Sequence, residues 1–110
     1  MATIKENYCS KEIYRLLIEK GFDGEVHTTF NKVGYTQPSI TLQMAMKWLR
    51  KKYYIYADPI KQGNYNDCSE YYTWIVARMG IIHRNSSVAD KLSYEEAVEA
   101  ALKYSLENLI

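Results

Sequence analysis

Cysteine, glycine and histidine are scarce in this chain of 110 residues, and their scarcity excludes several kinds of site. The two cysteines, Cys9 and Cys68, are too far apart for a CxxC redox or zinc pair, and two cysteines do not make a disulfide scaffold. The five glycines are scattered singly, so they form no GxGxxG or GxxxxGK phosphate loop and no GxSxG nucleophile motif. The usual nucleotide-binding and hydrolase signatures are missing from the sequence.

Long apolar runs are missing as well, and the first residues, MATIKENYCSKE, lack the apolar core of a secretory signal. We therefore expect a cytoplasmic protein with reduced thiols and no membrane partner. Hydrophobic residues make up 47% of the chain and charged residues 25%, which is typical of a globular protein. The length predicts a single domain over residues 1–110.

Candidate metal ligands and catalytic groups are few. The two histidines, His27 and His83, stand in no HxxxH or HxH pair, and Glu25 with His27 supplies only two of the ligands that zinc needs. A cysteine paired with a distant histidine stays open as a nucleophile, although a structural thiol is the simpler interpretation. Three carboxylates fall near a predicted turn, where they are usually solvated: Asp58, Asp67 and Glu70. We expect no enzyme activity, no metal and no cofactor.

The first third of the chain predicts a helix and a strand. Ser10 is a candidate N-cap for a helix over 11–20, Gly21 is its stop, and Phe22 can fold back on the last turn. Residues 25–30 alternate apolar and polar side chains, which indicates a half-buried strand. Residues 31–38 read as a loop, because Gly34 and Pro38 interrupt any pattern.

The central stretch, Ser39–Ala57, changes from a helical period to a strand period. Ser39 or Thr41 can cap a helix whose apolar face includes Leu49, and 54–57 then predicts a strand. Turn-forming residues at 62–67 predict a hairpin into a long strand from Cys68 to about Met79. Residues 81–83 fit either a bulged continuation of that strand or a short fourth strand.

The C-terminal segment predicts an amphipathic helix. Ser93 and Glu96 form a capping-box pattern, and Leu102 is central to the apolar face that follows. The predicted order is α-β-α-β-β-(β)-α. This order predicts an α+β fold, in which two or three helices cover one face of a small, mainly antiparallel sheet of three to four strands.

Several words of the sequence resemble a known family. They are YCSKE at 8–12, GFD at 21–23, ITLQMAMKWLR at 40–50 and SYEEAVEAALKYSLENLI at 93–110. Together they are similar to a family of short uncharacterised proteins of gut Bacteroidales and their phages and mobile elements. The resemblance implies a cytoplasmic setting and a phage or mobile-element origin, and it carries no activity, ligand or site residue over to this chain.

Tyrosine is the one residue type in excess, with eleven tyrosines against two phenylalanines. Tyrosine suits boundaries where one edge of the ring is wet, as at protein interfaces. We therefore expect the predicted hairpin to bind a protein partner or a second copy of the chain through an aromatic surface of Tyr54, Tyr56, Tyr72 and Trp74. The alternative is that these rings only stabilise the sheet through cross-strand pairs.

A second functional class is weak binding of single-stranded nucleic acid. Exposed aromatic rings would stack on bases while a basic cluster at the end of the central helix, Lys47, Arg50, Lys51 and Lys52, holds phosphates. Against this interpretation, the net charge is only +1, and cations near a helix C-terminus are explained by the helix dipole. Protein interaction is therefore the first hypothesis and nucleic-acid binding the second.

Overall fold

The computed structural model describes residues 8–24, 26–30, 36–64, 69–87 and 91–110. Within these ranges it has three helices and five strands: α1 (Lys11–Glu19), β1 (His27–Phe30), β2 (Thr36–Ser39), α2 (Leu42–Tyr53), β3 (Ile55–Asn64), β4 (Ser69–Arg78), β5 (Ile81–Asn85) and α3 (Tyr94–Asn108). The strands form two antiparallel sheets. The predicted α+β class is confirmed.

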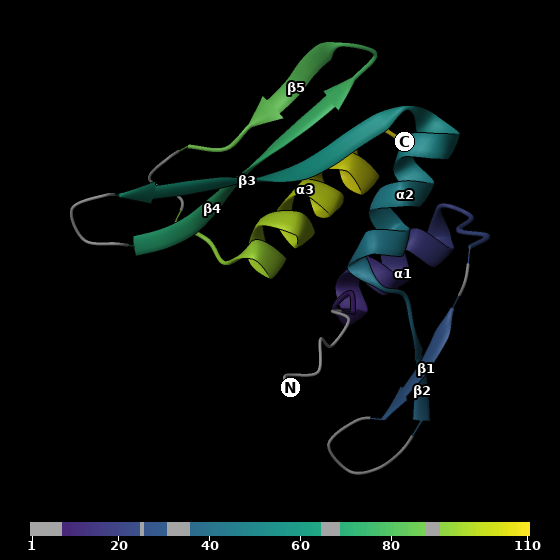
Figure 1. Ribbon diagram of the computed structural model, residues 1–110. Coiled ribbons are helices and arrows are strands. Elements are labelled where there is room, and N and C mark those ends of the chain that lie inside the picture. The colour runs from purple at the N-terminus through teal and green to yellow at the C-terminus, as the bar shows by residue number, and fades with distance from the viewer. Residues whose placement is uncertain (1–7, 25, 31–35, 65–68, 88–90) are drawn as a thin grey trace.

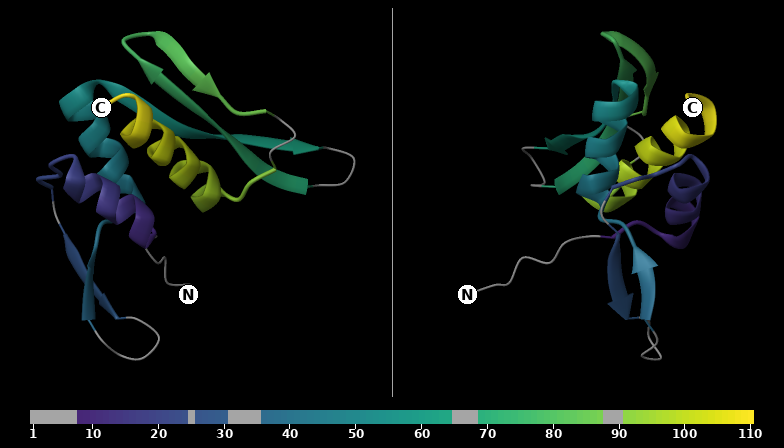
Figure 2. Two further views of the ribbon diagram at one scale, coloured as in Figure 1. Left: turned by 180° about the vertical axis from the view of Figure 1, so that it is seen from behind. Right: turned by 90° about the vertical axis from the view of Figure 1, so that its right-hand side faces the viewer.

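The three-stranded sheet and the helices form two layers. The sheet has the order β3-β4-β5, and α3 lies along one of its faces (Figure 1). The helices α1 and α2 contact α3, so the three helices stand together on that side of the sheet (Figure 2). The β1–β2 hairpin projects from the helices on the side away from the large sheet (Figure 2).

Each helix begins at a side chain that satisfies its free N–H groups. The hydroxyls of Ser10 and Thr41 accept hydrogen bonds from the third residue of α1 and α2, at 3.4 and 3.2 Å. Ser93 and Glu96 form the predicted capping box, with hydrogen bonds of 3.2 and 3.0 Å. The N–H of Ser93 lowers the pKa of the Glu96 carboxyl. The position of every helix start is thus specified locally.

The end of α1 is specified by Gly21, as predicted. Gly21 has a φ of +89°, which an L-residue adopts only at a cost. Its N–H donates to the carbonyl of Ile18 at 3.1 Å, and the N–H of Phe22 donates to the carbonyl of Leu17 at 2.9 Å. These two bonds define a Schellman motif. Phe22 turns back and packs against the core.

The core lies between α3, the other two helices and the inner face of the large sheet. The fully buried side chains of α3 are Ala97, Val98, Ala101, Leu102, Ser105 and Leu106. The sheet contributes Ile55, Ala57 and Val76, which share one face because cross-strand partners point to the same side. This packing buries one face of the sheet.

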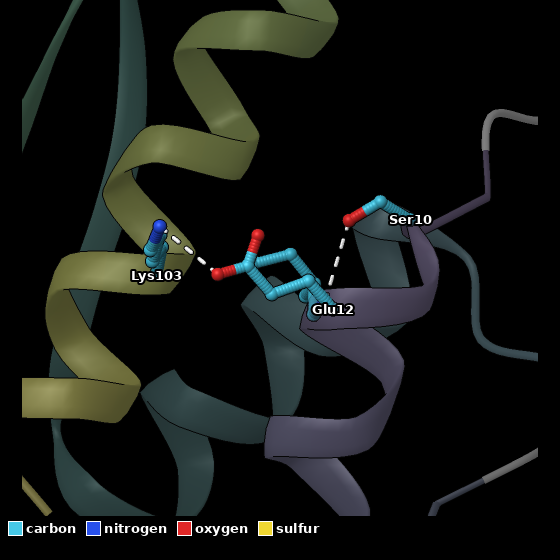
Figure 3. Close-up of polar contacts among 4 residues, drawn as sticks. Ser10, Glu12 and Lys103 are labelled. Atoms are coloured by element: carbon cyan, nitrogen blue, oxygen red, sulfur yellow. Dashed lines mark hydrogen bonds and ion pairs between the residues drawn. The ribbon is translucent and has the colours of Figure 1, made fainter.

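Polar contacts at the surface hold α1 against α3. Lys103 Nζ on α3 lies 2.9 Å from Glu12 Oε1 on α1 (Figure 3). The hydrogen bond to Glu12 raises the pKa of Lys103. The N–H of Ser10 donates to Glu99 Oε1 at 2.5 Å. Both contacts are solvent-exposed, so they fix the relative register of the two helices more than they add stability.

Residues 31–35 of the predicted loop lie outside the described residues, and the structure corrects the prediction for residues 36–38. Thr36–Ser39 is a strand, β2, which pairs with β1 in a hairpin, and Pro38 lies opposite Thr28. A proline is tolerated there because a two-stranded sheet has only edge strands. Consequently α2 begins after Thr41, and Ser39 is not its cap.

The hairpin of the large sheet is longer than predicted. The strand expected over 54–57 begins one residue later, at Ile55, because Tyr54 is the left-handed C-cap of α2 with a φ of +58°. It continues as β3 to Asn64, so Gln62–Asn64 are strand residues and not turn residues. The prediction stopped at Asp58-Pro59, which is unfavourable in a central strand but acceptable in an edge strand. Of the two alternatives for residues 81–83, the separate strand is the one that forms, as β5 (Ile81–Asn85). Its pairing with β4 shifts register between Val76 and Ala77, which the sequence did not indicate. Cys68 lies outside the described residues.

We predict that Leu49→Ala and Leu102→Ala each lower the free energy of unfolding by about 2–5 kcal/mol, because both side chains are fully buried. Urea denaturation followed by circular dichroism measures the change. The exposed Ile18 on α1 is the matched control, and Ile18→Ala should cost less than about 1 kcal/mol. Equal costs at buried and exposed positions would contradict this packing.

Candidate interaction surface

The four aromatic residues expected to form one binding surface lie on two faces of the sheet. Trp74 is only 8% exposed, because it faces α3 and its ring centroid lies 5.9 Å from that of Tyr104. Arg84 on β5 covers the ring from another side, with its guanidinium carbon 5.6 Å from the centroid. Trp74 is therefore a core residue.

Tyr72 lies on the same inner face as Trp74. Its ring packs edge-on against Tyr94 at the start of α3, with the centroids 5.4 Å apart. Its main chain exchanges two hydrogen bonds with Leu92, at 2.7 and 3.1 Å. The expected surface of four rings is thus wrong for Tyr72 and Trp74, because the chain's own helix packs on these two rings.

Tyr54 and Tyr56 are exposed, as a binding role requires. Tyr56 lies on the outer face of the sheet, in a row with Ala77 on β4 and Ile82 on β5. The same face carries Ile60 and Ile75, which are half-buried and lie outside the core cluster. The sheet face that carries these residues is called the outer face. Among the β3 residues on this face, Asp58 is the one with a charged side chain.

The most exposed large apolar residues of the described chain gather at one end of the sheet. They are Tyr54 (59%), Tyr56 (46%), Met79 (76%), Ile81 (65%) and Ile82 (58%), and we call them the sheet-end patch. Figure 1 shows why they meet: β3 begins, β4 ends and β5 begins at this end, beside the last turn of α2. Burial in a partner would remove this apolar surface from water.

The turn between β4 and β5 places an apolar side chain where the backbone is strained. Met79 and Gly80 form a two-residue hairpin loop with φ of +53° and +82°, as in a type I′ turn. Asn-Gly is the favoured pair in such turns, and a left-handed conformation costs an ordinary L-residue about 1–2 kcal/mol. A bulky methionine here is both strained and exposed.

The two edges of the large sheet differ. Trp74 uses its main-chain groups toward β5, where Ser86 N–H donates to its carbonyl at 2.8 Å and Ser86 Oγ accepts from its N–H at 2.6 Å. Its β3 partner, Pro59, is therefore in a non-hydrogen-bonded pair, and the proline nitrogen lies at the outer edge, where it removes a donor. The β5 edge has no such residue, and every residue of β5 is exposed.

Three of the four residues of the predicted basic cluster, Lys47, Lys51 and Lys52, line one pocket, and Arg50 does not. Lys47 and Lys51 lie one helical turn apart on the exposed face of α2, whereas Arg50 is half-buried on another face. Lys52 Nζ lies 5.4 Å from the ring centroid of Trp48 and 5.9 Å from that of Tyr53. Three of these cations fall in the last turn of α2, where they face the negative end of the helix dipole.

The candidate nucleophile Cys9 has the wrong environment for catalysis. The thiol is buried in the core, and this burial raises its pKa to about 12, with a smaller contribution from the charge of Glu99. A thiolate is needed for nucleophilic attack, so the Cys9 thiol is inert near neutral pH. The side chain of His27 accepts or donates a 3.2 Å hydrogen bond with the Tyr8 hydroxyl, and not with Cys9.

The carboxylates considered as metal ligands are not assembled in the described part of the chain. No group of three histidine, cysteine, aspartate or glutamate side chains there could hold a metal ion. Of the three turn carboxylates, Asp58 lies on β3, and the side chains of Asp67 and Glu70 lie outside what the structure describes, as does Glu25. None of the helices in the described ranges is long and apolar enough to cross a membrane.

Comparisons of the chain with protein-family models, with curated proteins and with solved structures found no match. The resemblance to the Bacteroidales and phage family therefore stays a prediction.

The sheet-end patch could be predicted only in part from the sequence. The ring type of Tyr54 and Tyr56 marks them as candidates, whereas the sequence around Gly80 makes Met79, Ile81 and Ile82 look like ordinary strand residues.

We predict that Cys9 reacts with iodoacetamide at pH 8 at least about a hundredfold more slowly in the folded protein than in urea, because burial suppresses the thiolate. The experiment uses the Cys68→Ser variant, so that Cys9 is the one thiol present. Mass spectrometry follows the modification. A Cys9 that is alkylated equally fast in the folded state would restore the nucleophile hypothesis.

Proposed function

We propose that this chain is a non-enzymatic protein-interaction module, and that it binds a second copy of itself through the sheet-end patch and the β5 edge. The observation that carries the proposal is the gathering of the five most exposed large apolar residues at the one sheet end where an edge strand is open. A cytoplasmic setting and a mobile-element origin are part of the same proposal.

The size of the patch supports a specific contact. If a fully exposed large side chain offers about 200 Å², the five exposed fractions add up to on the order of 600 Å². This area is divided between the two faces of the sheet, because Ile81 and Ile82 point to opposite sides of β5, and it is less than the roughly 800 Å² that each partner contributes to a standard interface. Main-chain bonds along β5 would contribute the rest.

The symmetry of the strand edge favours a second copy as the partner. Two β5 strands can pair antiparallel about a twofold axis, and each then supplies the unpaired N–H and C=O groups that the other needs. The pair would join two three-stranded sheets into one of six strands. The register has to bring the start of β5 in each copy close to the twofold axis, because the sheet-end patch lies at that end of the strand.

We predict that the double variant Tyr56→Ser and Ile82→Thr weakens self-association at least tenfold, because it removes both ends of the exposed row on the outer face. The dissociation constant of the wild-type dimer should lie in the micromolar range and is measured by sedimentation equilibrium. Circular dichroism should report unchanged helical content, because α3 packs on the opposite face.

The matched control is the double variant Ile18→Ser and Val26→Thr. These residues are the exposed apolar side chains on α1 and before β1, with exposed fractions of 45% and 43%, and neither is near the patch. This variant should associate as tightly as the wild type. A wild-type chain that remains monomeric at millimolar concentration would refute self-association.

A separate prediction uses the strain at Met79. Met79→Asn should raise the free energy of unfolding of the monomer by about 0.5–1 kcal/mol, because asparagine tolerates the left-handed conformation of this turn. The same substitution should weaken self-association, because it removes the most exposed apolar side chain. Urea denaturation at low protein concentration measures the change in stability, and sedimentation equilibrium measures the change in self-association. A variant that is more stable but associates as tightly as the wild type would exclude Met79 from the contact.

A further inference from the structure

A pocket of about 360 Å³ lies between α2 and the segment that follows α1. Its apolar wall is formed by Phe22, Met44 and Trp48. The rings of Phe22 and Trp48 are tilted by 58° with their centroids 5.5 Å apart. The volume falls at the lower end of the roughly 300–1,000 Å³ of small-molecule sites.

The wall of this pocket is held by specific contacts. Trp48 Nε1 donates to Asp23 Oδ1 at 2.9 Å, which holds the indole ring against the segment after α1. Gly24 lies against the Phe22 ring, and a Cβ at this position would come within 2.6 Å of the ring. A larger residue at Gly24 would have to displace the ring. The shape of the pocket therefore depends on this short segment as well as on α2.

The rim of the pocket is positive. Lys47, Lys51 and Lys52 line it, against the single carboxylate of Asp23. Among the described residues, none of the three ammonium groups forms an ion pair, and the described contacts of Lys52 are with aromatic rings. The pocket thus combines an apolar wall with a net charge of +2 from its lining residues.

We propose that this pocket binds a nucleoside monophosphate, with the base against the apolar wall and the phosphate at the lysines. A phosphate monoester carries about −1.5 to −2 charges at pH 7, which matches the net charge of the rim. Lysine is a common phosphate ligand because its ammonium acts as a point charge. Aromatic and thioether side chains suit the flat face of a base. No residue of the sheet-end patch lines the pocket, so the proposal does not depend on self-association.

The test uses adenosine 5′-monophosphate as the probe and two-dimensional NMR as the readout. The chain has two tryptophans, so two indole N–H signals report on two places. The signal of Trp48 should shift in the presence of millimolar probe, and that of Trp74, on the other side of the core, should not. Adenosine and inorganic phosphate at the same concentration should each cause a smaller shift, because each lacks one half of the ligand.

The double variant Lys47→Ala and Lys51→Ala should weaken binding about tenfold or more. Both side chains are exposed, so the fold should be retained. The matched control is Lys11→Ala and Arg15→Ala, which removes two exposed cations at the same helical spacing from α1. It leaves the net charge equal to that of the first variant, and it should bind the probe as the wild type does.

Two further results decide the proposal. Binding to the wild-type chain should weaken as salt is raised, because the exposed ammonium charges are screened. The proposed site would be contradicted if the Trp48 signal still shifts in the Lys47→Ala and Lys51→Ala variant. It would also be contradicted if no shift occurs in the wild-type chain at millimolar probe. A 5′-phosphorylated dinucleotide that binds at least tenfold more tightly than the mononucleotide would identify the end of a nucleic-acid strand as the source of the ligand.

Discussion

The packing of α3 is the interaction on which the rest of the fold depends. This helix contacts β3 and β4 of the large sheet as well as α1 and α2, so elements from both ends of the sequence meet on it. Alanines at 97 and 101 allow close approach, and Leu102 and Leu106 fill the space between the layers. The buried hydroxyl of Ser105 is satisfied within the helix, by the carbonyl of Ala101 at 2.8 Å.

One helix layer can cover only one face of a sheet, and this limit explains the distribution of the tyrosines. Several of them border the core, with the ring packed against it and partly exposed: Tyr14, Tyr53, Tyr72, Tyr94 and Tyr104. Tyrosine therefore does act at a boundary in this chain, but mostly at the boundary between the core and water. Tyr54 and Tyr56 differ because they lie where no described helix packs on the sheet.

Local signals in the sequence were sufficient for the helices. Ser10, Gly21 and Ser93 each act through a hydrogen bond to a residue three positions away, so their effect can be predicted without knowledge of the fold. Strand β2 and the second half of β3 could not be read in this way, because Pro38 and Pro59 are tolerated only at sheet edges and the edges are a property of the tertiary structure. The lysine-rimmed pocket escaped prediction for a related reason, since Phe22 and Trp48 meet only when α1 and α2 are placed.

Pro59 would also set an upper limit to the proposed self-association. A sheet with two open edges can add copies at both sides and grow into a ribbon without end. In the described part of the large sheet, the β3 edge lacks a donor at Pro59, whereas β5 contains no proline and all of its residues are exposed. Growth from a single edge stops once two copies have paired, because no second edge is available for a third. A single proline on an edge strand can thus limit association to two copies and prevent the growth of fibres, even in a chain with a large exposed apolar surface.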